Sequence, residues 1–179
     1  MCLWGNKGIF PGAGKVIWRD WYTHDTVNAS VGSNTTLDAP LGHINVHIRD
    51  GSVLLLHKEP AYTIEETRQG PYELLVSLSS SEEAFGTAFV DDGISFPPGP
   101  STSLTFRAGA GSLSIFSEGN FTIAQKLDQV TLLGIAKKPS AVIMEGKNVT
   151  DWQFLQEQEK LILSGLGIGL NAKTVLNWN

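Results

Sequence analysis

The fold class follows from residues 43–56, whose sequence is HINVHIRDGSVLLL. Every second residue from 44 to 48 is apolar, which is the period of a half-buried strand. Asp50-Gly51 is a turn signal, and a second apolar run follows over residues 53–56. This stretch therefore predicts a strand, a turn and a second strand.

The same pattern of short apolar segments between turn residues continues along the chain. It recurs at residues 72–79, 85–89, 104–106, 113–115, 121–123, 130–133 and 141–144. Turn signals such as Asp91-Asp92-Gly93 separate the segments. Because many short strands between turns are typical of a sandwich or barrel, we predict an all-β fold of antiparallel β-sandwich modules. The polar residues 65–71 mark the expected boundary between two modules.

Residues 151–160 are the stretch with a local helix signal. Thr150 or Asp151 can cap such a helix, and the Gln, Glu and Lys residues that follow favour helices. From the residues alone, helix and strand remain equal alternatives here.

Composition and charge argue against two classes of partner. The net charge is −5 and the isoelectric point is near 5.3, with Lys and Arg scattered along the chain, so no basic face is available for nucleic acid. No apolar run approaches the ~20 residues that span a bilayer. Residues 1–7 lack a charged region followed by an apolar one. We expect no nucleic-acid partner, no membrane partner and no signal peptide in this chain.

Four Asn-x-Ser/Thr sequons indicate a secreted protein. They lie at Asn28, Asn34, Asn120 and Asn148, and each is a candidate N-glycosylation site. Asn34 and Asn120 are favoured because neighbouring Gly and Ser indicate exposed turns. The alternative is that a Ser/Thr-rich β protein contains sequons that are never modified. Cys2 is the single cysteine, so an intrachain disulfide is impossible and the redox compartment stays open.

No carboxylate arrangement in the sequence has the form of a glycosidase active site. Such a site needs two carboxyl groups that face each other at roughly 5 to 9.5 Å. The candidates are the sequence-adjacent pairs Glu65-Glu66, Glu82-Glu83 and Asp91-Asp92. Neighbours on a strand point to opposite faces, and neighbours in a turn point into water. We therefore predict no catalytic residue on this chain.

Histidine spacing gives no metal site. The histidines are His24, His43, His47 and His57. Two of them share one face of a predicted strand, but four residues separate them by about 13 Å, too far for one ion. We predict no metal ligand.

The glycine-rich stretches and the tryptophans give only weak candidates for ligand binding. Residues 12–15 (GAGK) and 165–169 (GLGIG) each lack positions that a P-loop or a dinucleotide loop needs, so both are interpreted as turns and no cofactor is predicted. The tryptophans are Trp4, Trp18, Trp21, Trp152 and Trp178. They could form a sugar-stacking platform, although Trp in a small sandwich more often lies in a core or an interface.

A series of motifs occurs in a set order along the chain. They are FPG (10–12), VIWRDWY (16–22), LDAPLGHINVHIRDGSVL (37–54), EPA (59–61), ETRQ (66–69), FVDDG (89–93), LLGI (132–135) and PSAV (139–142). In content and order they closely resemble the tail of glycoside hydrolase family 31, particularly its fungal α-glucosidases. The resemblance covers roughly residue 8 to the C-terminus.

The resemblance implies an organisation for the whole chain. In that family these landmarks follow the catalytic (β/α)8 barrel, whose aspartates are the nucleophile and the acid/base, and lie in two C-terminal β-sandwiches. It implies a partial proximal sandwich in residues 1–69 and a distal sandwich in residues 70–179. It also favours two strands with a turn near Glu157-Gln158 over a helix at residues 151–160. A barrel alone takes about 250 residues, more than the 179 residues of this chain.

Two positions depart from the family pattern. Asp50 stands where the family commonly has the first Gly of an Arg-Gly-Gly turn, and Asp tolerates left-handed turn geometry better than most residues. Ile94 stands where an acidic or amide side chain commonly follows Asp-Asp-Gly, so the turn loses a polar group.

Two functional hypotheses of different classes follow. In the first, the chain is the non-catalytic C-terminal portion of a secreted α-glucosidase-type hydrolase, and its partner is the catalytic barrel of the parent enzyme. In the second, it is a free-standing β-sandwich that binds protein or a carbohydrate, an α-glucoside being the candidate. The family's proximal sandwich takes its first strands from residues upstream of Phe10, where this sequence has only nine, so we favour the first hypothesis.

Overall fold

The computed structural model describes residues 5–97 and 99–179, so Cys2, Trp4 and Pro98 lie outside the described part. Its elements are β1 (Gly5–Gly8), β2 (Trp18–Asp20), β3 (Thr35–Asp38), β4 (His47–Arg49), β5 (Ser52–His57), α1 (Ile64–Gln69), β6 (Tyr72–Ser77), β7 (Ala84–Val90), β8 (Thr102–Gly109), β9 (Ser112–Gly119), β10 (Lys126–Leu133), β11 (Val142–Met144), β12 (Lys147–Asn148), β13 (Trp152–Leu155), the 3-10 turn η1 (Gln156–Gln158), β14 (Lys160–Leu163), β15 (Ile168–Gly169) and β16 (Thr174–Trp178). Within the described residues, no helix has the length and apolar character needed to cross a membrane.

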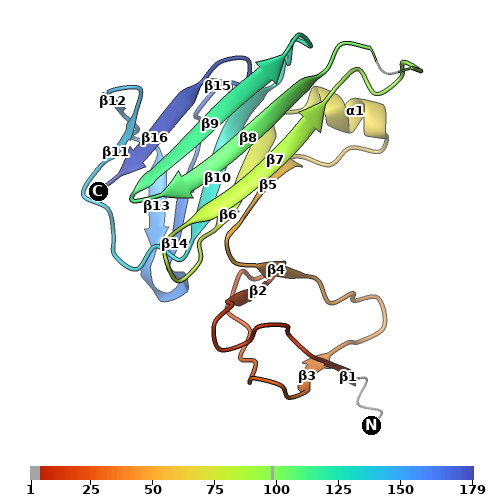
Figure 1. Cartoon of the computed structure of the whole chain (residues 1–179), viewed down its shortest axis with the longest axis vertical. Coiled ribbons are helices and arrows are strands. Elements are labelled where there is room, and N and C mark those ends of the chain that lie inside the picture. Colours follow the sequence, from red (N-terminus) through yellow and green to blue (C-terminus); the bar gives the residue numbers. More distant parts are fainter. Residues whose placement is uncertain (1–4, 98) are drawn as a thin grey trace.

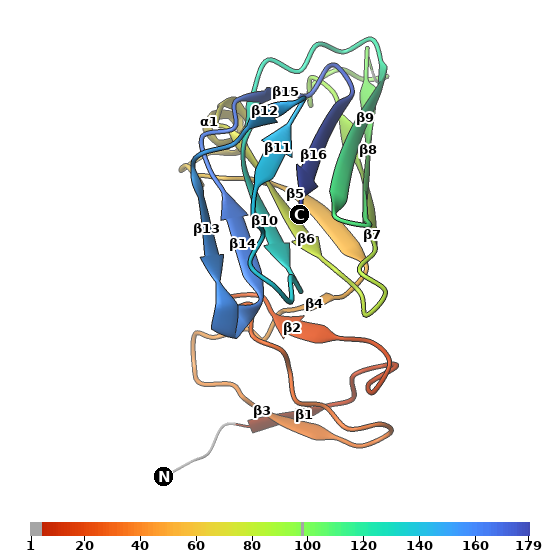
Figure 2. The same cartoon turned by 90° about the vertical axis from the view of Figure 1, so that its left-hand side faces the viewer.

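Strands β5 to β16 form a β-sandwich with two layers (Figures 1 and 2). One layer has the strand order β12-β11-β16-β9-β8-β7, and the other has the order β5-β6-β10-β14-β13 with β15 beside β10. A pairing between Ser52 and Phe85 joins β5 to β7 at the edge of the two layers. The all-β sandwich prediction is confirmed, although β6 and β10 pair in parallel, so the pairing is mixed.

The core lies between the two layers because the strands alternate buried and exposed side chains. In β8, for example, residues 102, 104, 106 and 108 are buried and 103 and 107 are exposed. The largest fully buried side chains include Phe106, Leu74, Leu104, Leu113, Leu132 and Leu161. Gly86 lets β7 approach β5, because a Cβ at this position would lie 2.1 Å from the Val53 carbonyl oxygen.

Residues 5–50, which we call the N-terminal segment, form two short sheets outside the sandwich. β1 pairs with β3, and β2 pairs with β4, both antiparallel. Figure 1 shows these strands beyond one end of the sandwich, opposite to α1. Ile48 of β4 is 4% exposed and packs against Leu75 and Leu133, which belong to β6 and β10. These two strands are therefore covered on both faces, by the core and by the N-terminal segment.

Arg19 is a buried polar link between the N-terminal segment and the sandwich. Its side chain is on β2, is 4% exposed, and donates hydrogen bonds to Ser77 Oγ at 2.7 Å and to the Leu78 carbonyl at 3.4 Å. Burial lowers the pKa of the guanidinium, and the charge of Asp50 opposes that effect. A buried cation costs desolvation energy unless its donors are satisfied, so these hydrogen bonds fix β2 against β6.

Asp50 has a different role from the one expected at the β4–β5 turn. Gly51 takes the left-handed conformation, with φ of 69°, and Asp50 is buried beside it. The Asp50 carboxylate accepts a hydrogen bond from the Ile17 amide at 3.0 Å, and the Asp50 amide donates to the Ile17 carbonyl at 2.9 Å. Asp50 thus holds the strand pair β2–β4 together, a use that a Gly at this position could not supply.

Several sequence predictions need correction. The first strand of the opening hairpin is only β4 (His47–Arg49), and Ile44 and Val46 are exposed before it. The apolar pair at residues 121 and 123 lies in a loop. Residues 151–160 are β13, η1 and the start of β14, as the family resemblance implied, so the local helix signal there is wrong.

A partial proximal sandwich would leave an apolar face uncovered, bearing Ile44, Val46, Ile48, Val53 and Leu55, but the structure leaves this face only partly exposed. Ile48 and Val53 are 4% and 3% exposed and lie in cores, whereas Ile44 is 75% exposed. Strand β5, from the first expected module, pairs with β6 and β7 of the sandwich. The division into modules at residues 69 and 70 stays a prediction.

Candidate functional site

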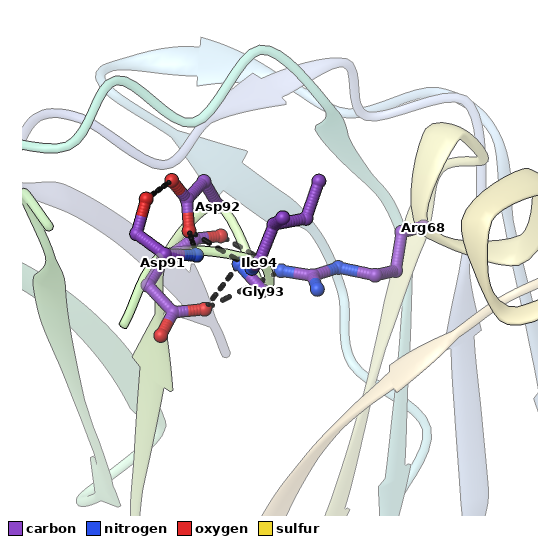
Figure 3. Close-up of polar contacts among 6 residues, drawn as sticks. Arg68, Asp91, Asp92, Gly93 and Ile94 are labelled. Carbon is purple, nitrogen blue, oxygen red and sulfur yellow. Dashed lines mark hydrogen bonds and ion pairs between the residues drawn. The ribbon is translucent and has the colours of Figure 1, made fainter. Parts of the chain in front are cut away.

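A pocket of about 340 Å³ lies between helix α1 and the turn that follows β7. We call it the α1–β7 pocket. Its lining consists of Ile64, Glu65, Arg68, Gln69, Tyr72, Val90, Asp91, Asp92, Gly93, Ile94, Phe121 and Gln125. Figure 3 shows Arg68 extending toward the turn from Asp91 to Ile94. The wall combines carboxylates, one guanidinium and amides with apolar side chains.

Helix α1 forms because residues 63–66 make a capping box. The Thr63 hydroxyl accepts a hydrogen bond from the Glu66 amide, and the Glu66 carboxylate accepts one from the Thr63 amide, each at 3.2 Å. We predicted only a polar boundary over residues 65–71. The Thr-x-x-Glu pattern was the signal that could have found this six-residue helix, which carries Glu65 and Arg68 to the pocket.

The turn after β7 is held by its own aspartates. Asp91 Oδ1 accepts a hydrogen bond from the Gly93 amide at 2.8 Å. Asp92 Oδ1 accepts from the Ile94 and Ser95 amides at 3.0 Å, and the Ser95 hydroxyl donates to Asp92 Oδ2. The hydrogen bonds from Ser95, followed by that from Ile94, lower the pKa of Asp92 to about 2. This carboxyl therefore stays ionised at neutral pH and cannot act as a proton donor.

Arg68 fixes the distance between α1 and the turn. Its Nη2 donates to the Asp91 carbonyl at 2.7 Å and lies 3.5 Å from Asp91 Oδ1. The guanidinium also lies directly over Gly93, where an added Cβ would be 1.3 Å from Arg68 Nη1 (Figure 3). Gly93 has a φ of 70°, so the position favours glycine for its backbone as well as for the space that Arg68 occupies.

Tyr72 is the buried polar residue of the pocket. It lies at the start of β6, is 8% exposed, and stacks obliquely against the His57 ring, with centroids 4.8 Å apart. Burial raises the pKa of its phenol. Its hydroxyl forms no hydrogen bond with another described residue and is not among the fully buried unpaired atoms, and Tyr72 lines the α1–β7 pocket.

The structure places the three candidate carboxylate pairs in different surroundings. Glu82 and Glu83 are exposed in the turn between β6 and β7, with Glu82 at a φ of 59°. Glu65 lies beside Asp91 and Asp92 around the α1–β7 pocket, a gathering that the sequence did not predict. Asp92 is ionised and Asp91 is bonded within its turn and to Arg68. Neither aspartate is therefore free to serve as the acid that glycoside cleavage requires.

A carboxyl group with a raised pKa lies outside the α1–β7 pocket. Burial raises the pKa of Glu73, on β6, and its carboxylate accepts a hydrogen bond from the Gln129 amide at 3.3 Å. Glu73 also lines a cavity of about 150 Å³ with Trp21 and His24, where the N-terminal segment meets the sandwich. This cavity is part of the contact between the two regions.

The histidines do not converge. His43 packs against Tyr22, and His47 meets the edge of Phe10. His24 and His57 each bury Nδ1 without a hydrogen-bond partner in the described part of the chain. Across residues 5–97 and 99–179, no three His, Cys, Asp or Glu side chains are grouped so that they could hold a metal ion.

The remaining predicted features lie apart on the surface. All four sequon residues, Asn28, Asn34, Asn120 and Asn148, are exposed. Trp18 and Trp21 belong to the N-terminal segment, and Trp152 and Trp178 pack against the sandwich core, so these four rings form no single platform. Residues 12–15 form turns, as predicted, and residues 165–167 precede the short strand β15.

No family model matches the chain. An α-glucosidase of Schizosaccharomyces pombe is 38% identical over 174 residues, which is 97% of this chain and 18% of the relative. A second S. pombe protein, an uncharacterised family 31 glucosidase, is 39% identical over 89% of this chain and 16% of the relative. An α-glucosidase of Aspergillus niger is 44% identical over 80% of this chain and 14% of the relative. The chain belongs to glycoside hydrolase family 31. It is a C-terminal region of this family and spans less than a fifth of the length of these relatives.

Solved structures share the fold of this chain. The crystal structure of a glucosidase II α subunit, in a form with bound α3-Glc2, gives a TM-score of 0.79 at 22% identity and covers 98% of this chain and 21% of that chain. An α-1,4-glucan lyase of Gracilariopsis lemaneiformis gives a TM-score of 0.59 at 13% identity, over 97% of this chain and 20% of that chain. The sandwich and the N-terminal segment are thus matched together.

Proposed function

We propose that the chain is the non-catalytic C-terminal portion of an α-glucosidase-type hydrolase and that it supports the catalytic (β/α)8 barrel. In this proposal the parent enzyme hydrolyses terminal α-linked glucose from oligosaccharides. The match to α-glucosidases over nearly the whole chain supports it, as does the absence of a facing acid/base pair around the α1–β7 pocket.

The observation that carries the proposal is the apolar surface of the N-terminal segment. Its exposed large apolar side chains are Ile9, Tyr22, Val31, Leu41, Ile44 and Val46. Exposed apolar side chains that form a contiguous patch mark an interaction surface, and we propose that these six contribute to one. The family's order, in which the barrel comes before these landmarks, makes this segment the part of the chain nearest to the barrel in sequence. We assign the barrel contact to it.

A chimera tests this assignment. The matched region of the S. pombe α-glucosidase is replaced by this chain, and the hydrolysis of maltose is measured. The chimera should be soluble and active, and the double change Leu41→Glu with Ile44→Glu should abolish activity by exposing charge to the barrel contact. The matched control is Tyr62→Glu, at a fully exposed aromatic residue just before α1 and outside the α1–β7 pocket, which should leave activity unchanged. Full activity of the double variant would refute the contact.

The same proposal predicts that the 179-residue chain alone does not hydrolyse maltose. An oxocarbenium-like transition state needs two facing carboxyl groups, and Asp92 remains ionised at neutral pH. Activity of the purified chain that is lost on mutating any of its Asp or Glu residues would contradict the non-catalytic role.

We further propose that the parent enzyme is secreted and carries N-glycans at the four exposed sequons. Exposure of Asn28, Asn34, Asn120 and Asn148 supports this. Expression behind a signal peptide, followed by glycosidase treatment and mass spectrometry, measures occupancy at each site. An unchanged mass at all four would refute glycosylation.

The second candidate function is a β-sandwich binding module for carbohydrate. The observation that favours it is the α1–β7 pocket, with its open Tyr72 hydroxyl. Support of the barrel and binding of a sugar are compatible, because helix α1, which lines the pocket, lies at the opposite end of the sandwich from the N-terminal segment (Figure 1).

A further inference from the structure

The α1–β7 pocket contains polar groups that the fold leaves unused. The Tyr72 hydroxyl, the Gln69 and Gln125 amides and the Glu65 carboxylate all line it, and none of them hydrogen-bonds to another described side chain or backbone group. Tyr72 is the most informative of these residues because it is only 8% exposed. Polar groups of mostly buried residues normally have a partner, and this hydroxyl bonds to no other described residue, so it is available to a hydrogen-bonding ligand.

Apolar side chains stand beside these polar groups. Val90 and Phe121 line the pocket, and Ile64 and Ile94 add apolar surface that is 80% and 89% exposed. Ligand sites combine apolar lining with a few convergent polar groups in this way. The ligand that fits has an apolar face and hydroxyl groups around its edge, which describes a pyranose ring.

The charge of the pocket narrows the class of ligand. Its lining carries three carboxylates, on Glu65, Asp91 and Asp92, against the single guanidinium of Arg68. This negative balance repels phosphate, sulfate and carboxylate groups. The carboxylates of Asp91 and Asp92 are already bonded to backbone amides of their own turn, so they are poorly placed to converge on a cation. A neutral ligand is favoured.

The size of the pocket limits the ligand to one ring. Its volume of about 340 Å³ lies at the lower end of the ~300 to 1,000 Å³ found for small-molecule sites. We propose that the α1–β7 pocket is a binding site for one neutral pyranose unit of an oligosaccharide, in which Tyr72 and Glu65 bond to ring hydroxyls and Ile94 packs on the ring face. The site is separate from the barrel contact, and its binding is a property of this chain alone.

Two features fix the shape of the pocket. Arg68 holds α1 to the turn through the Asp91 carbonyl, and the absence of a side chain at Gly93 leaves room for that guanidinium. The substitution Gly93→Ala would displace Arg68 and change the width of the pocket. Ile94, where the family commonly has a polar residue, supplies apolar surface at the rim in this chain.

The test is an NMR titration of the unglycosylated 179-residue chain, labelled with ¹⁵N, with methyl α-D-glucopyranoside. We expect saturable shifts of amides in residues 64–72 and 90–95. Glucose 6-phosphate should bind at least tenfold more weakly because of its charge. Tyr72→Phe removes only the hydroxyl and should weaken binding about three- to tenfold, the effect of one hydrogen bond. Gly93→Ala should weaken it further.

Tyr22→Phe is the matched control, because Tyr22 lies in the N-terminal segment and bonds to the Ile44 carbonyl; it should not change the affinity. A dispersed spectrum of each variant shows that it is folded. Absence of saturable shifts in the folded wild type, equal binding by Tyr72→Phe, or tighter binding of glucose 6-phosphate would each overturn the proposal. None of these results bears on the barrel contact, which the chimera tests independently.

Discussion

The N-terminal segment and the sandwich solve the burial of apolar side chains in different ways. The sandwich places a continuous cluster from Val53 to Leu176 between its two layers. The N-terminal segment buries few large apolar side chains, chiefly Phe10 and Ile48, and Ile48 depends on the sandwich for its contacts. This contrast teaches that the sandwich can fold on its own contacts, whereas residues 5–50 gain their order from the surfaces they touch.

The largest expected difference is between matched leucine truncations in the two regions. Leu132→Ala, at a fully buried position of β10, should lower the free energy of unfolding by about 2–5 kcal/mol through lost burial and a cavity. Leu41→Ala, at a position that is 98% exposed, should change it by less than about 0.5 kcal/mol. Urea unfolding followed by tryptophan fluorescence measures both changes in unfolding free energy. Equal changes for the two variants would contradict the difference between the two regions.

An intermediate loss of stability is expected when Arg19, the buried link between the N-terminal segment and the sandwich, is replaced. Arg19→Ala removes the donor to Ser77 Oγ and leaves that fully buried hydroxyl unpaired. The cost should be about 1.5–3 kcal/mol, and it should appear as faster hydrogen exchange in β2 and β4 while β8 and β10 stay protected. Arg49→Ala, at an exposed position of β4, is the control and should have no such effect. Faster hydrogen exchange throughout the sandwich would show that Arg19 stabilises the sandwich core rather than the contact between the N-terminal segment and the sandwich.

The smallest expected effect is a dependence on pH. Burial lowers the pKa of His24 from its usual 6.5, helped by Lys160 and Arg19 and opposed by Asp20 and Asp25. The unfolded chain therefore takes up a proton near pH 6.5 that the folded chain resists. Stability from this group is complete above pH 6.5 and is lost as the pH falls below it. The pKa of His57 is lowered in the same way by burial.

Unfolding free energies at pH 7.5 and pH 5.5 test whether stability falls with pH as expected for His24. The wild type should be less stable at pH 5.5, and His24→Gln should reduce the difference. His43→Gln, at an exposed position, should leave it intact. Glu73, whose pKa is raised by burial, contributes in the opposite direction, because its stabilising effect is present below the usual carboxyl pKa and is lost as the pH rises. The comparison with His24→Gln isolates the histidine. A stability that rises between pH 7.5 and 5.5 would contradict the buried, neutral state of His24.

The sequence predicted the strands wherever periodicity and burial agree. Strands β8 and β9 follow alternating apolar residues closely, because each has one face in the core, whereas β6 and β10 contain apolar runs because both of their faces are covered. The strand assignments were wrong where a contact with a distant part of the chain determines the local structure. Ile44 and Val46 alternate like a strand, yet no neighbouring strand pairs with them, and only His47–Arg49 finds a partner in β2. At residues 151–160, helix-favouring side chains were overruled by pairing between β13 and β14.

The candidate pocket could not be predicted because its residues are distant in sequence. Glu65 and Arg68 come from a helix that only the capping box of Thr63 and Glu66 indicates. Asp91 and Asp92 were interpreted as a turn and as a sequence-adjacent carboxylate pair, and Tyr72 as part of a strand. Only the packing of α1 against the turn brings them together. The family resemblance helped with the order of elements but gave no role to these positions.

Hydrogen exchange of the 179-residue chain, resolved by residue, tests the central claim most directly. If the sandwich is self-sufficient and the N-terminal segment is supported from outside, amides in β6, β8, β9 and β10 should exchange only on global unfolding. Amides in β1 to β4 should exchange orders of magnitude faster through local opening. Uniform protection from Phe10 to Trp178 in a monomer would contradict the account, because residues 5–50 would then be as stable as the sandwich without any further partner.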